Sequence, residues 1–254
     1  MGKVDSYIKE KLKIDGALHF SLIDPENVNI ESLPLLLKEI KNAGSDAIMV
    51  GGSTIVNQIL LYDVVDVIKK YCDLPVILFP NNVTGITSNA DAIWFMSLFN
   101  SINPYFITGA QMMAAPYIKR IGIETLSMAY LIVGEGKTAG FIGYANPIPI
   151  DKPEVAAAYA LAAEIMGFKY IYLEAGSGAK KHIPPDFVSY VKKYLDKIIL
   201  VAGGGIRNGD IAYSISKAGA DIVVTGNIII ESIDILYDIV DGVKRGGIEK
   251  IKGV

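Results

Sequence analysis

The chain has 254 residues, of which 51% are hydrophobic and 20% charged, a length and composition typical of one α/β barrel with a large core. Its formal net charge of -3 and pI near 5.5 lack the basic excess that nucleic-acid binding requires, so nucleic acid is excluded as an expected ligand. The lone Cys72 excludes an internal disulfide, and no apolar run reaches the about 20 residues of a membrane span, so we expect a cytoplasmic protein with at most peripheral membrane contact.

Short apolar runs alternate with helical stretches along the whole chain, which is the pattern of repeated βαβ units. The predicted strands are residues 17–23, 47–50, 75–79, 92–98, 126–133, 170–174, 198–202 and 222–225. The predicted helices are residues 32–42, 55–70, 105–120, 153–166, 185–195, 210–217 and 232–243. Residues 1–13 are expected to add a short helix over the barrel floor. These elements predict a TIM (β/α)8 barrel that occupies residues 1–254 as a single domain.

One crossover helix is missing from this pattern. The segment between the third and fourth predicted strands, residues 81–91, reads NNVTGITSNAD, and Asn, Thr, Ser and Gly are poor helix formers. We therefore predict a modified barrel whose third helix is replaced by an extended or irregular crossover. The thinly covered flank is either just a locally shortened connection or a ligand groove. The nearby Trp94, Phe95 and Phe99 favour the groove. Bulky substitutions in the crossover, such as Gly85→Trp, should then shorten the ligand accepted.

Two glycine-rich strand ends predict a phosphate site. The seventh strand runs into AGGGIR, with Gly203 and Gly204, and the eighth into TGN, with Gly226 and Asn227. Glycines let backbone amides approach an anion, and barrels commonly build a phosphate site from the loops after strands seven and eight. Glycines that merely turn the chain are the alternative for either motif alone.

The sixth strand ends in YLEAGSGA and supplies the leading catalytic candidate. Glu174 leaves the strand beside a Gly-Ser-Gly turn, where its carboxylate can accept hydrogen bonds from substrate hydroxyls. Ser177 and its flanking amides can add phosphate contacts. The alternatives are a structural ion pair for Glu174 and a core position for Tyr172.

The ends of the first two strands, HFSLIDPEN and VGGST, offer oxygen ligands. Mg²⁺ commonly uses one or two protein oxygens while substrate phosphates supply the rest, and Asp24 with Ser53 suits such a site. The alternative for Asp24 is an Asp-Pro turn that caps the next helix. His19 lies inside the first strand and is expected to be a hydrogen-bonded core residue.

The order and spacing of HFSLIDPEN, VGGST, YLEAGSGA, AGGGIR and TGN resemble the geranylgeranylglyceryl phosphate synthase family of archaea, which is related to bacterial heptaprenylglyceryl phosphate synthases. The resemblance implies a modified barrel with a replaced third helix. It also implies Mg²⁺-dependent transfer of a geranylgeranyl group from geranylgeranyl diphosphate to sn-glycerol 1-phosphate, the ether-forming step of archaeal phospholipid biosynthesis. A homo-oligomer is expected from the resemblance only.

Site roles follow from the same resemblance. Asp24 and Ser53 correspond to the magnesium positions, and Glu174 would hold the glycerol hydroxyls. The glycerol-phosphate positions are Tyr172, Leu173, Glu174, Ala175, Gly176, Ser177, Gly178, Gly203, Gly204, Gly226 and Asn227. The motifs leave prenyl chain length open and do not cover residues 134–150 or 180–182.

Two other functions use the same phosphate cradle. An isomerase, aldolase or lyase of a phosphorylated sugar or indole intermediate would want a Schiff-base lysine or an acid/base pair, and the strand-end motifs contain no lysine. A non-catalytic barrel that binds a phosphometabolite would need neither metal nor prenyl transfer.

Overall fold

The structure is a computed structural model that describes residues 2–54, 57–226, 228 and 232–253. Eight parallel strands form a closed barrel in chain order, and the ring closes where β1 pairs with β8, Leu18 opposite Ile222. The predicted fold is therefore confirmed. The strands are β1 (Leu18–Ile23), β2 (Ala47–Val50), β3 (Val76–Leu78), β4 (Ala92–Leu98), β5 (Glu124–Ile132), β6 (Tyr170–Glu174), β7 (Ile199–Gly203) and β8 (Ile222–Thr225).

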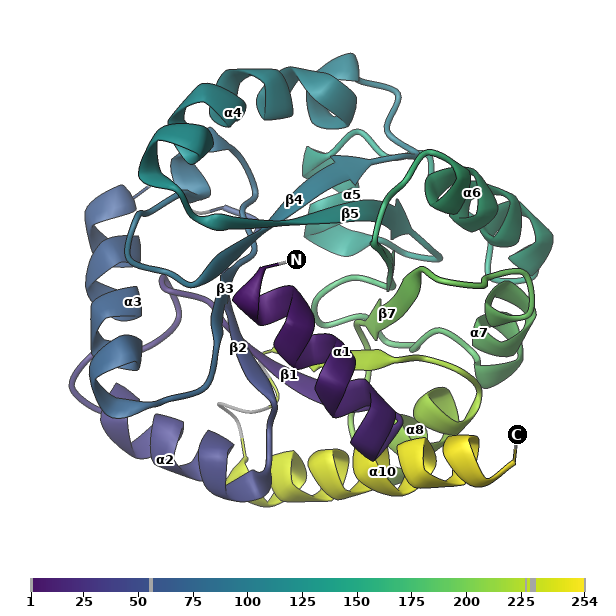
Figure 1. Ribbon diagram of the computed structural model, residues 1–254. Helices are drawn as coiled ribbons and strands as arrows, with labels where there is room; N and C mark the ends of the chain where they lie inside the picture. Colours follow the sequence, from purple (N-terminus) through teal and green to yellow (C-terminus); the bar gives the residue numbers. More distant parts are fainter. Residues whose placement is uncertain (1, 55–56, 227, 229–231, 254) are drawn as a thin grey trace.

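Helices surround this barrel in the described residues, as Figure 1 shows in a view along the barrel axis. They are α1 (Lys3–Asp15), α2 (Leu33–Ala43), α3 (Gln58–Tyr71), α4 (Ala110–Ile121), α5 (Lys137–Ile142), α6 (Pro153–Ile165), α7 (Pro185–Lys192), α8 (Gly209–Lys217) and α10 (Ile233–Lys252). A π-helical turn, η2 (Tyr105–Gly109), precedes α4, where the sequence predicted one continuous helix. No helix in these residues is long and apolar enough to cross a membrane.

Successive side chains on each strand point alternately into the barrel and out toward the helices. Both sides are buried, which explains why nearly every strand residue is apolar. On β4, Trp94 points into the barrel and packs against Phe20 and Tyr170, whereas Phe95 points outward to the helical layer. Parallel strands that are buried on both faces need apolar residues at consecutive positions. That requirement is why short apolar runs identified the strands so well.

The third crossover has no α-helix, as predicted. Between β3 and β4 the chain makes only a single 3₁₀ turn, η1 (Val83–Gly85), which Asn82 begins by accepting a hydrogen bond from the backbone N–H of Val83. The flank between α3 and α4 is therefore covered by irregular chain.

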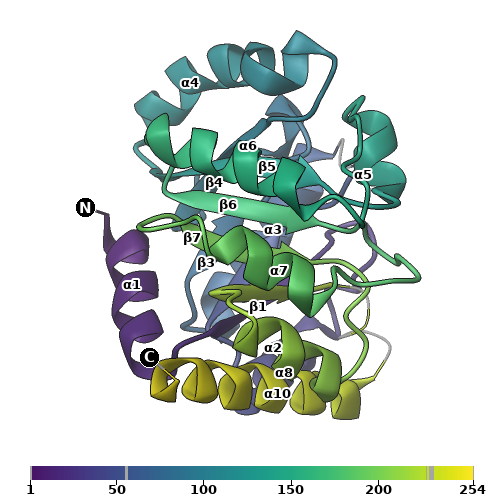
Figure 2. The same cartoon turned by 90° about the vertical axis from the view of Figure 1, so that its right-hand side faces the viewer.

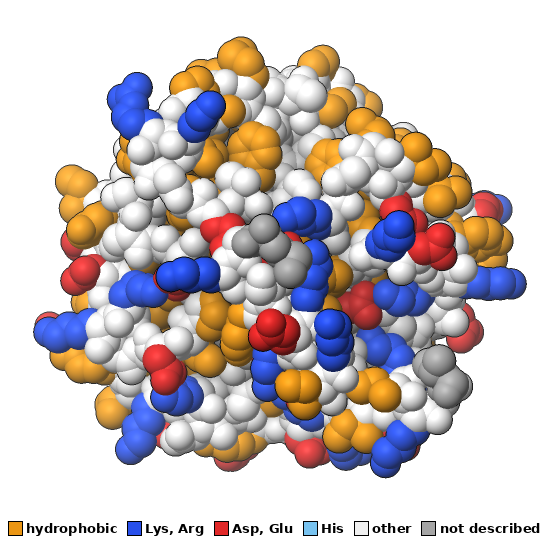
Figure 3. Space-filling model, in the orientation of Figure 1, with side chains coloured by type: hydrophobic (Ala, Val, Ile, Leu, Met, Phe, Trp, Pro, Cys, Tyr) orange, Lys and Arg blue, Asp and Glu red, His pale blue; other side chains and the backbone are white. Residues whose placement is uncertain are grey.

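The N-terminal helix α1 lies across the end of the barrel where the strands begin, which we call the floor (Figures 1 and 2). The carboxylate of Glu124 on β5 accepts hydrogen bonds from the backbone N–H groups of Val4 and Asp5, at 2.8 and 2.9 Å. This carboxylate satisfies free donors of the first turn and complements the helix dipole. Lysines and acidic residues are interspersed over the floor face in Figure 3.

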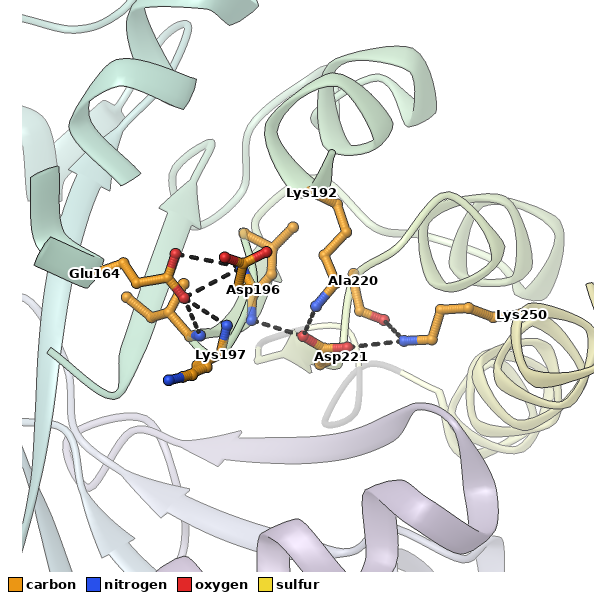
Figure 4. Close-up of polar contacts among 9 residues, drawn as sticks. Glu164, Lys192, Asp196, Lys197, Ala220, Asp221 and Lys250 are labelled. Atoms are coloured by element: carbon orange, nitrogen blue, oxygen red, sulfur yellow. Dashed lines mark hydrogen bonds and ion pairs between the residues drawn. The ribbon is translucent and has the colours of Figure 1, made fainter. Parts of the chain in front are cut away.

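Ion pairs also fix the floor around the start of β8. Asp221 accepts hydrogen bonds from Lys192 at 2.6 Å, from Lys250 at 2.9 Å and from the backbone N–H of Leu200 at 2.9 Å (Figure 4). Nearby, the Glu164 carboxylate accepts backbone N–H groups from the turn that leads into β7. These contacts join α6, α7 and α10 to the starts of strands.

Candidate active site

The opposite end of the barrel, where the strands finish, holds a cavity of about 450 Å³. We call this end the mouth. One part of the cavity is polar and contains Asp24, Ser53, Glu174 and Ser177. The other part is an apolar trough that leaves the barrel between β4, α4 and the η1 crossover. A single cavity thus joins polar strand ends to an apolar channel.

The trough occupies the flank that lacks a helix. Phe95 faces it from the outer side of β4, Ile86 from the crossover, and Ala114 and Ile118 from α4. A regular third helix would fill this space, so the irregular crossover is what leaves the trough available.

Two expectations for this flank were wrong. Phe99 does not line the cavity, because its ring packs edge-on against Phe168 at 4.9 Å between centroids. Gly85 is not among the lining residues either. A Cβ built on Gly85 would lie 2.9 Å from the Cα of Pro80, so a side chain at this position would meet the backbone of the crossover. A bulky residue at position 85 would disturb the crossover rather than shorten the trough.

Glu174 ends β6 with its side chain inside the mouth, and only 7% of the residue is exposed. Its Oε1 accepts a hydrogen bond from the backbone N–H of Gly176 at 2.6 Å, and its Oε2 accepts one from the Tyr130 hydroxyl at 3.2 Å. Burial raises the pKa of Glu174, and the bonds from Gly176, Tyr130 and Tyr172 offset only part of that rise. A buried carboxylate with a raised pKa is a suitable proton acceptor.

Tyr130 is a site residue that the sequence analysis missed. It lies opposite Tyr172 in the register of β5 and β6, and the two rings meet at 5.2 Å between centroids with Phe79 beside both. Burial and the Glu174 charge raise the pKa of the Tyr130 hydroxyl well above its usual range, so it remains a hydrogen-bond donor. Tyr130 follows Met128 by two residues on the predicted strand, so both side chains point to the same, inner face. This alternation is the signal from which Tyr130 could have been identified.

The glycine-rich strand ends interlock tightly around Glu174. A Cβ on Gly203 would lie 2.1 Å from the Tyr172 hydroxyl oxygen, and one on Gly204 would lie 2.7 Å from both Glu174 Oε1 and the Gly176 nitrogen. Gly176 and Gly204 also have φ of +105° and +88°, a region that other residues rarely adopt. These glycines therefore bring the ends of β6 and β7 together and do more than turn the chain.

The remaining predicted glycerol-phosphate positions differ in where they lie. Ser177 and Gly178 are exposed at the mouth, and Gly226 directly follows β8, where an added Cβ would lie 3.6 Å from Leu22 Cδ2. Leu173 and Ala175 are buried in the outer core cluster, so only their backbone atoms can face a ligand. Asn227 lies outside the described residues.

Asp24 and Ser53 line the same cavity from the ends of β1 and β2. Burial raises the pKa of Asp24, although its carboxylate accepts hydrogen bonds from the Glu26 backbone N–H at 3.0 Å and the Asn27 amide at 2.8 Å. The turn expected as the alternative for Asp24 is therefore present, but Asp24 does not cap α2, whose N-cap is Ser32, and the turn coexists with a cavity-facing carboxylate. His19 is a hydrogen-bonded core residue, as expected, between Ser45 and Thr225 at 2.8 Å each.

The segment of residues 134–150, left without a role by the sequence, forms one wall of the cavity. It contains the short helix α5, whose Ala139 and Ile142 line the cavity. The backbone N–H of Gly136 bonds to the Ala175 carbonyl oxygen at 3.2 Å, which joins this wall to the β6 loop. Six residues that include a glycine gave too weak a periodicity to predict this helix.

The described residues contain no group of three or more His, Cys, Asp or Glu side chains that could hold a metal ion. Among the described residues that line the cavity there is also no lysine. The site therefore offers one carboxylate and the hydroxyls of Ser53 and Thr54 near the first two strands, and a second, buried carboxylate across the mouth.

Comparison with known proteins agrees with this geometry. A geranylgeranylglyceryl phosphate synthase of Thermofilum pendens is 48% identical over 252 residues, which cover 98% of both chains, and one of Thermococcus kodakarensis is 52% identical over 229 residues, 90% of both. The crystal structure of (S)-3-O-geranylgeranylglyceryl phosphate synthase from Thermoplasma acidophilum, in complex with its substrate sn-glycerol-1-phosphate, superimposes with a TM-score of 0.90 at 38% identity, covering 96% of this chain and 99% of that one. Residues 7–244 match the PcrB family, and the chain belongs to that family.

Proposed function

We propose that this protein is a prenyltransferase that joins the geranylgeranyl group of geranylgeranyl diphosphate to a hydroxyl of sn-glycerol 1-phosphate. The observation that carries the proposal is the single cavity that connects Glu174 and Ser177 at the end of β6 with the apolar trough beneath α4. The polar part of the cavity suits the glycerol phosphate acceptor and the apolar trough suits the long prenyl donor, and the reaction needs both at the same time. The names of the relatives and the ligand of the Thermoplasma acidophilum enzyme support the same substrates.

In this reaction the carbon–oxygen bond to diphosphate breaks, and the glycerol hydroxyl forms a new ether bond to the first prenyl carbon. The amides of the β6 and β7 loops would hold the phosphate of the acceptor. Glu174 would accept a hydrogen bond from the attacking hydroxyl and then its proton, while Tyr130 and the Gly176 amide hold the carboxylate in place. The trough would exclude water from the reacting carbon.

A divalent cation fits this site. Mg²⁺ prefers oxygen ligands and often takes only one or two from protein, and Asp24 and Ser53 present such oxygens to the cavity opposite Glu174. When bound, the ion would neutralise charge on the departing diphosphate. We propose Asp24 and Ser53 as the residues that hold it.

The alternative functions receive less support. A Schiff-base aldolase needs a lysine in the cavity, and the described lining residues include none. A small sugar phosphate has no use for the apolar trough. A non-catalytic phosphate-binding barrel would retain the cradle, and only an activity measurement separates it from an enzyme.

The direct test is incubation of the protein with sn-glycerol 1-phosphate, Mg²⁺ and prenyl diphosphates of different lengths, followed by mass analysis of the lipid products. We expect a prenylglyceryl phosphate that forms fastest with the C20 donor and stops forming when a chelator removes the metal. Phosphate-ligand binding without any ether product would contradict the proposal. Product formation that the chelator does not affect would contradict the proposed dependence on Mg²⁺.

The trough gives a second, more local test. Ala114→Trp would fill space beside Ile86 and Ile118, so donors shorter than C20 should be favoured over the C20 donor by about tenfold, the effect of a few lost apolar contacts. Competition between C15 and C20 donors measures this ratio. The matched control is Ala115→Trp, because Ala115 is exposed on the same helix. Equal ratios in both variants would mean that the prenyl chain binds elsewhere.

A further inference from the structure

Asn82 lies where the polar part of the cavity passes into the apolar trough. The preceding residue, Asn81, donates a hydrogen bond to the Ser53 carbonyl oxygen at 3.2 Å, so the start of the crossover is fixed beside the loop that follows β2. The apolar residues that come after it, Val83 and Ile86, line the same cavity. A prenyl diphosphate joins a charged group to an apolar chain, so its diphosphate would lie at this boundary.

The hydrogen bonds of Asn82 fix the orientation of its side-chain amide. Its Oδ1 accepts one hydrogen bond from the backbone N–H of Val83 at 2.8 Å and another from the Tyr105 hydroxyl at 2.5 Å. A backbone N–H can only donate, so the oxygen must face it, and both lone pairs of that oxygen are then used. The Nδ2 group, which carries two N–H donors, makes no hydrogen bond to any residue that the structure describes.

The other side-chain amides of the cavity are already engaged. Among the described lining residues there is no lysine, arginine or histidine, so amides and hydroxyls are the side-chain donors that could meet an anion. Asn27, Asn81 and Gln111 each donate at least one amide N–H to another residue of the chain. Within the described part of the chain, Asn82 is therefore the lining amide that keeps both N–H groups for a ligand.

Tyr105 holds this amide from the other side of the trough. It begins the π-helical turn η2 and does not itself line the cavity, so it can act on a ligand only through Asn82. Its ring packs edge-on against Phe106, 5.2 Å between centroids, and its backbone N–H donates to Asn103 Oδ1 at 3.0 Å. Such π-turns inside helices are frequent at functional sites. The ring and the backbone of Tyr105 are thus both fixed, and the hydroxyl is aimed at Asn82.

We propose that Asn82 binds the diphosphate of the prenyl donor, with Nδ2 donating to a diphosphate oxygen, and that Tyr105 is the positioning residue that holds the amide in this orientation. The inference rests on the proposed function and adds a residue to its donor site. Diphosphate oxygens are strong acceptors, and a fixed donor gains strength as charge moves onto the departing group. The residues assigned to glycerol phosphate lie on other strand ends, so acceptor binding should not depend on Asn82.

The test is calorimetry of the full chain with inorganic diphosphate and excess Mg²⁺, without a prenyl donor. Asn82→Asp keeps an oxygen for Val83 and Tyr105 but replaces the donor with a charged oxygen, so affinity should fall by about 100-fold. Asn82→Ser keeps a capping oxygen and adds no charge, and should lose about tenfold. Tyr105→Phe removes only the hydroxyl and should lose about threefold, because the amide can then turn.

Two matched controls carry the same changes outside the cavity. Asn57→Asp adds a charge at the exposed N-cap of α3, and Tyr117→Phe removes a hydroxyl from a tyrosine that is 43% exposed on α4. Both should bind diphosphate within about twofold of the unaltered chain, since water and salt screen exposed groups. Thermal unfolding of each variant shows whether the Tyr105 bond merely braces the crossover against α4.

Several results would overturn the inference. One is an unaltered chain that does not bind diphosphate. Another is a loss confined to Asn82→Asp, because charge repulsion alone would then explain it. A third is Tyr105→Phe with a lowered unfolding temperature and unchanged diphosphate affinity, which would make Tyr105 a brace. If Asn82 variants bind sn-glycerol 1-phosphate as poorly as diphosphate, the cavity as a whole is distorted and the assignment is wrong.

The same measurements separate this inference from the proposed function. If the unaltered chain makes the ether product and all variants bind diphosphate equally well, the role of Asn82 is removed and the function stands. If diphosphate binds through Asn82 but no ether forms, the function is removed and the site stands. Tyr105→Phe leaves the backbone of the crossover unchanged, so it decides the question even where an Asn82 variant fails to fold.

Discussion

At the floor of the barrel, Asp5 accepts hydrogen bonds from the Tyr170 hydroxyl at 2.8 Å, from Lys9 at 3.0 Å and from Lys169 at 3.3 Å. At the mouth, Glu174 is equally buried, but it receives hydrogen bonds from tyrosines and an amide and has no lysine or arginine partner among the described residues. Burial by itself acts to raise the pKa of each carboxyl, and the hydrogen bonds act to lower it. At Asp5 the bonds from Tyr170 and the two lysines outweigh burial and lower the pKa, whereas at Glu174 burial prevails.

The contrast separates stability from function. A carboxylate that is held ionised by lysines stabilises the fold at neutral pH, and a buried carboxylate with a raised pKa costs stability there. A carboxylate that carries such a cost at a strand end is expected where the group reacts with a ligand. If the comparison is right, removing a mouth carboxylate should damage activity alone, and removing a floor carboxylate should damage stability alone.

The largest effect is expected at Glu174. Glu174→Gln keeps size and some hydrogen bonding but removes the proton acceptor, so single-turnover prenyl transfer should fall by about 10² to 10⁴. Thermal unfolding of the same preparation should be unchanged or slightly improved, because the buried charge is gone. A stable variant with near-normal turnover would refute the role of Glu174 as base, and a variant that fails to fold would make it a structural residue like Asp5.

The second effect concerns the acidic side of the mouth. Asp24→Asn should reduce turnover by about 10², since metal-assisted charge neutralisation contributes several kcal/mol, while affinity for sn-glycerol 1-phosphate stays within about twofold. Calorimetry with the phosphate ligand checks the second statement. Glu31→Gln, an exposed acid in the same loop, is the control and should leave both quantities unchanged. Equal losses of affinity and rate would contradict the separation of metal and phosphate halves.

The sequence predicted the barrel and the strand ends well because both depend on local patterns. Buried parallel strands must be apolar throughout, and Glu174 and Asp24 each follow such a strand directly. The trough was predicted from a missing helix, and that reasoning identified the flank but not its lining. Ala114 and Ile118 lie on a helix that ordinary amphipathic packing explains, so only the closed barrel reveals that they face a cavity. Tyr130 was missed because its role depends on neighbours distant in sequence, whereas α5 was missed because six residues that include a glycine show too weak a periodicity.

The third effect is on stability at the floor. Asp221→Ala would leave the ammonium groups of Lys192 and Lys250 without their shared partner, and burial already lowers the pKa of Lys250 (Figure 4). We expect a loss of about 3 kcal/mol in the free energy of unfolding, measured by urea denaturation, with turnover unchanged. Asp241→Ala removes the exposed pair with Arg245 on α10, which water and salt screen, and should have a much smaller effect than Asp221→Ala. If both variants lose the same small amount, the Asp221 network does not hold the floor together.

The smallest predicted effect is a pH dependence of the free energy of unfolding. It arises from a histidine in the barrel wall, between the floor and the mouth. His19 is fully buried on β1, with its ring nitrogens 2.8 Å from the hydroxyl oxygens of Ser45 and Thr225, and burial, with a smaller contribution from Lys244, lowers its pKa to about 3. The unfolded chain has an ordinary histidine pKa of about 6.5, so below that pH it binds a proton that the folded chain refuses. Stability should therefore be full above about pH 6.5 and should fall by about 2 kcal/mol by pH 5.

The lowered pKa values of Asp5 and Asp15 place their own losses below this window, and the raised pKa values of Glu174 and Asp24 act in the opposite direction, so the share of His19 is measured against a variant that cannot titrate. His19→Gln keeps a hydrogen-bonding side chain but cannot titrate, so its urea midpoint should vary much less over the same window. Parallel slopes for the two proteins would assign the pH dependence to another group. A slope that disappears in His19→Gln would show that the buried ring between Ser45 and Thr225 stays neutral in the folded chain while the unfolded chain takes up a proton.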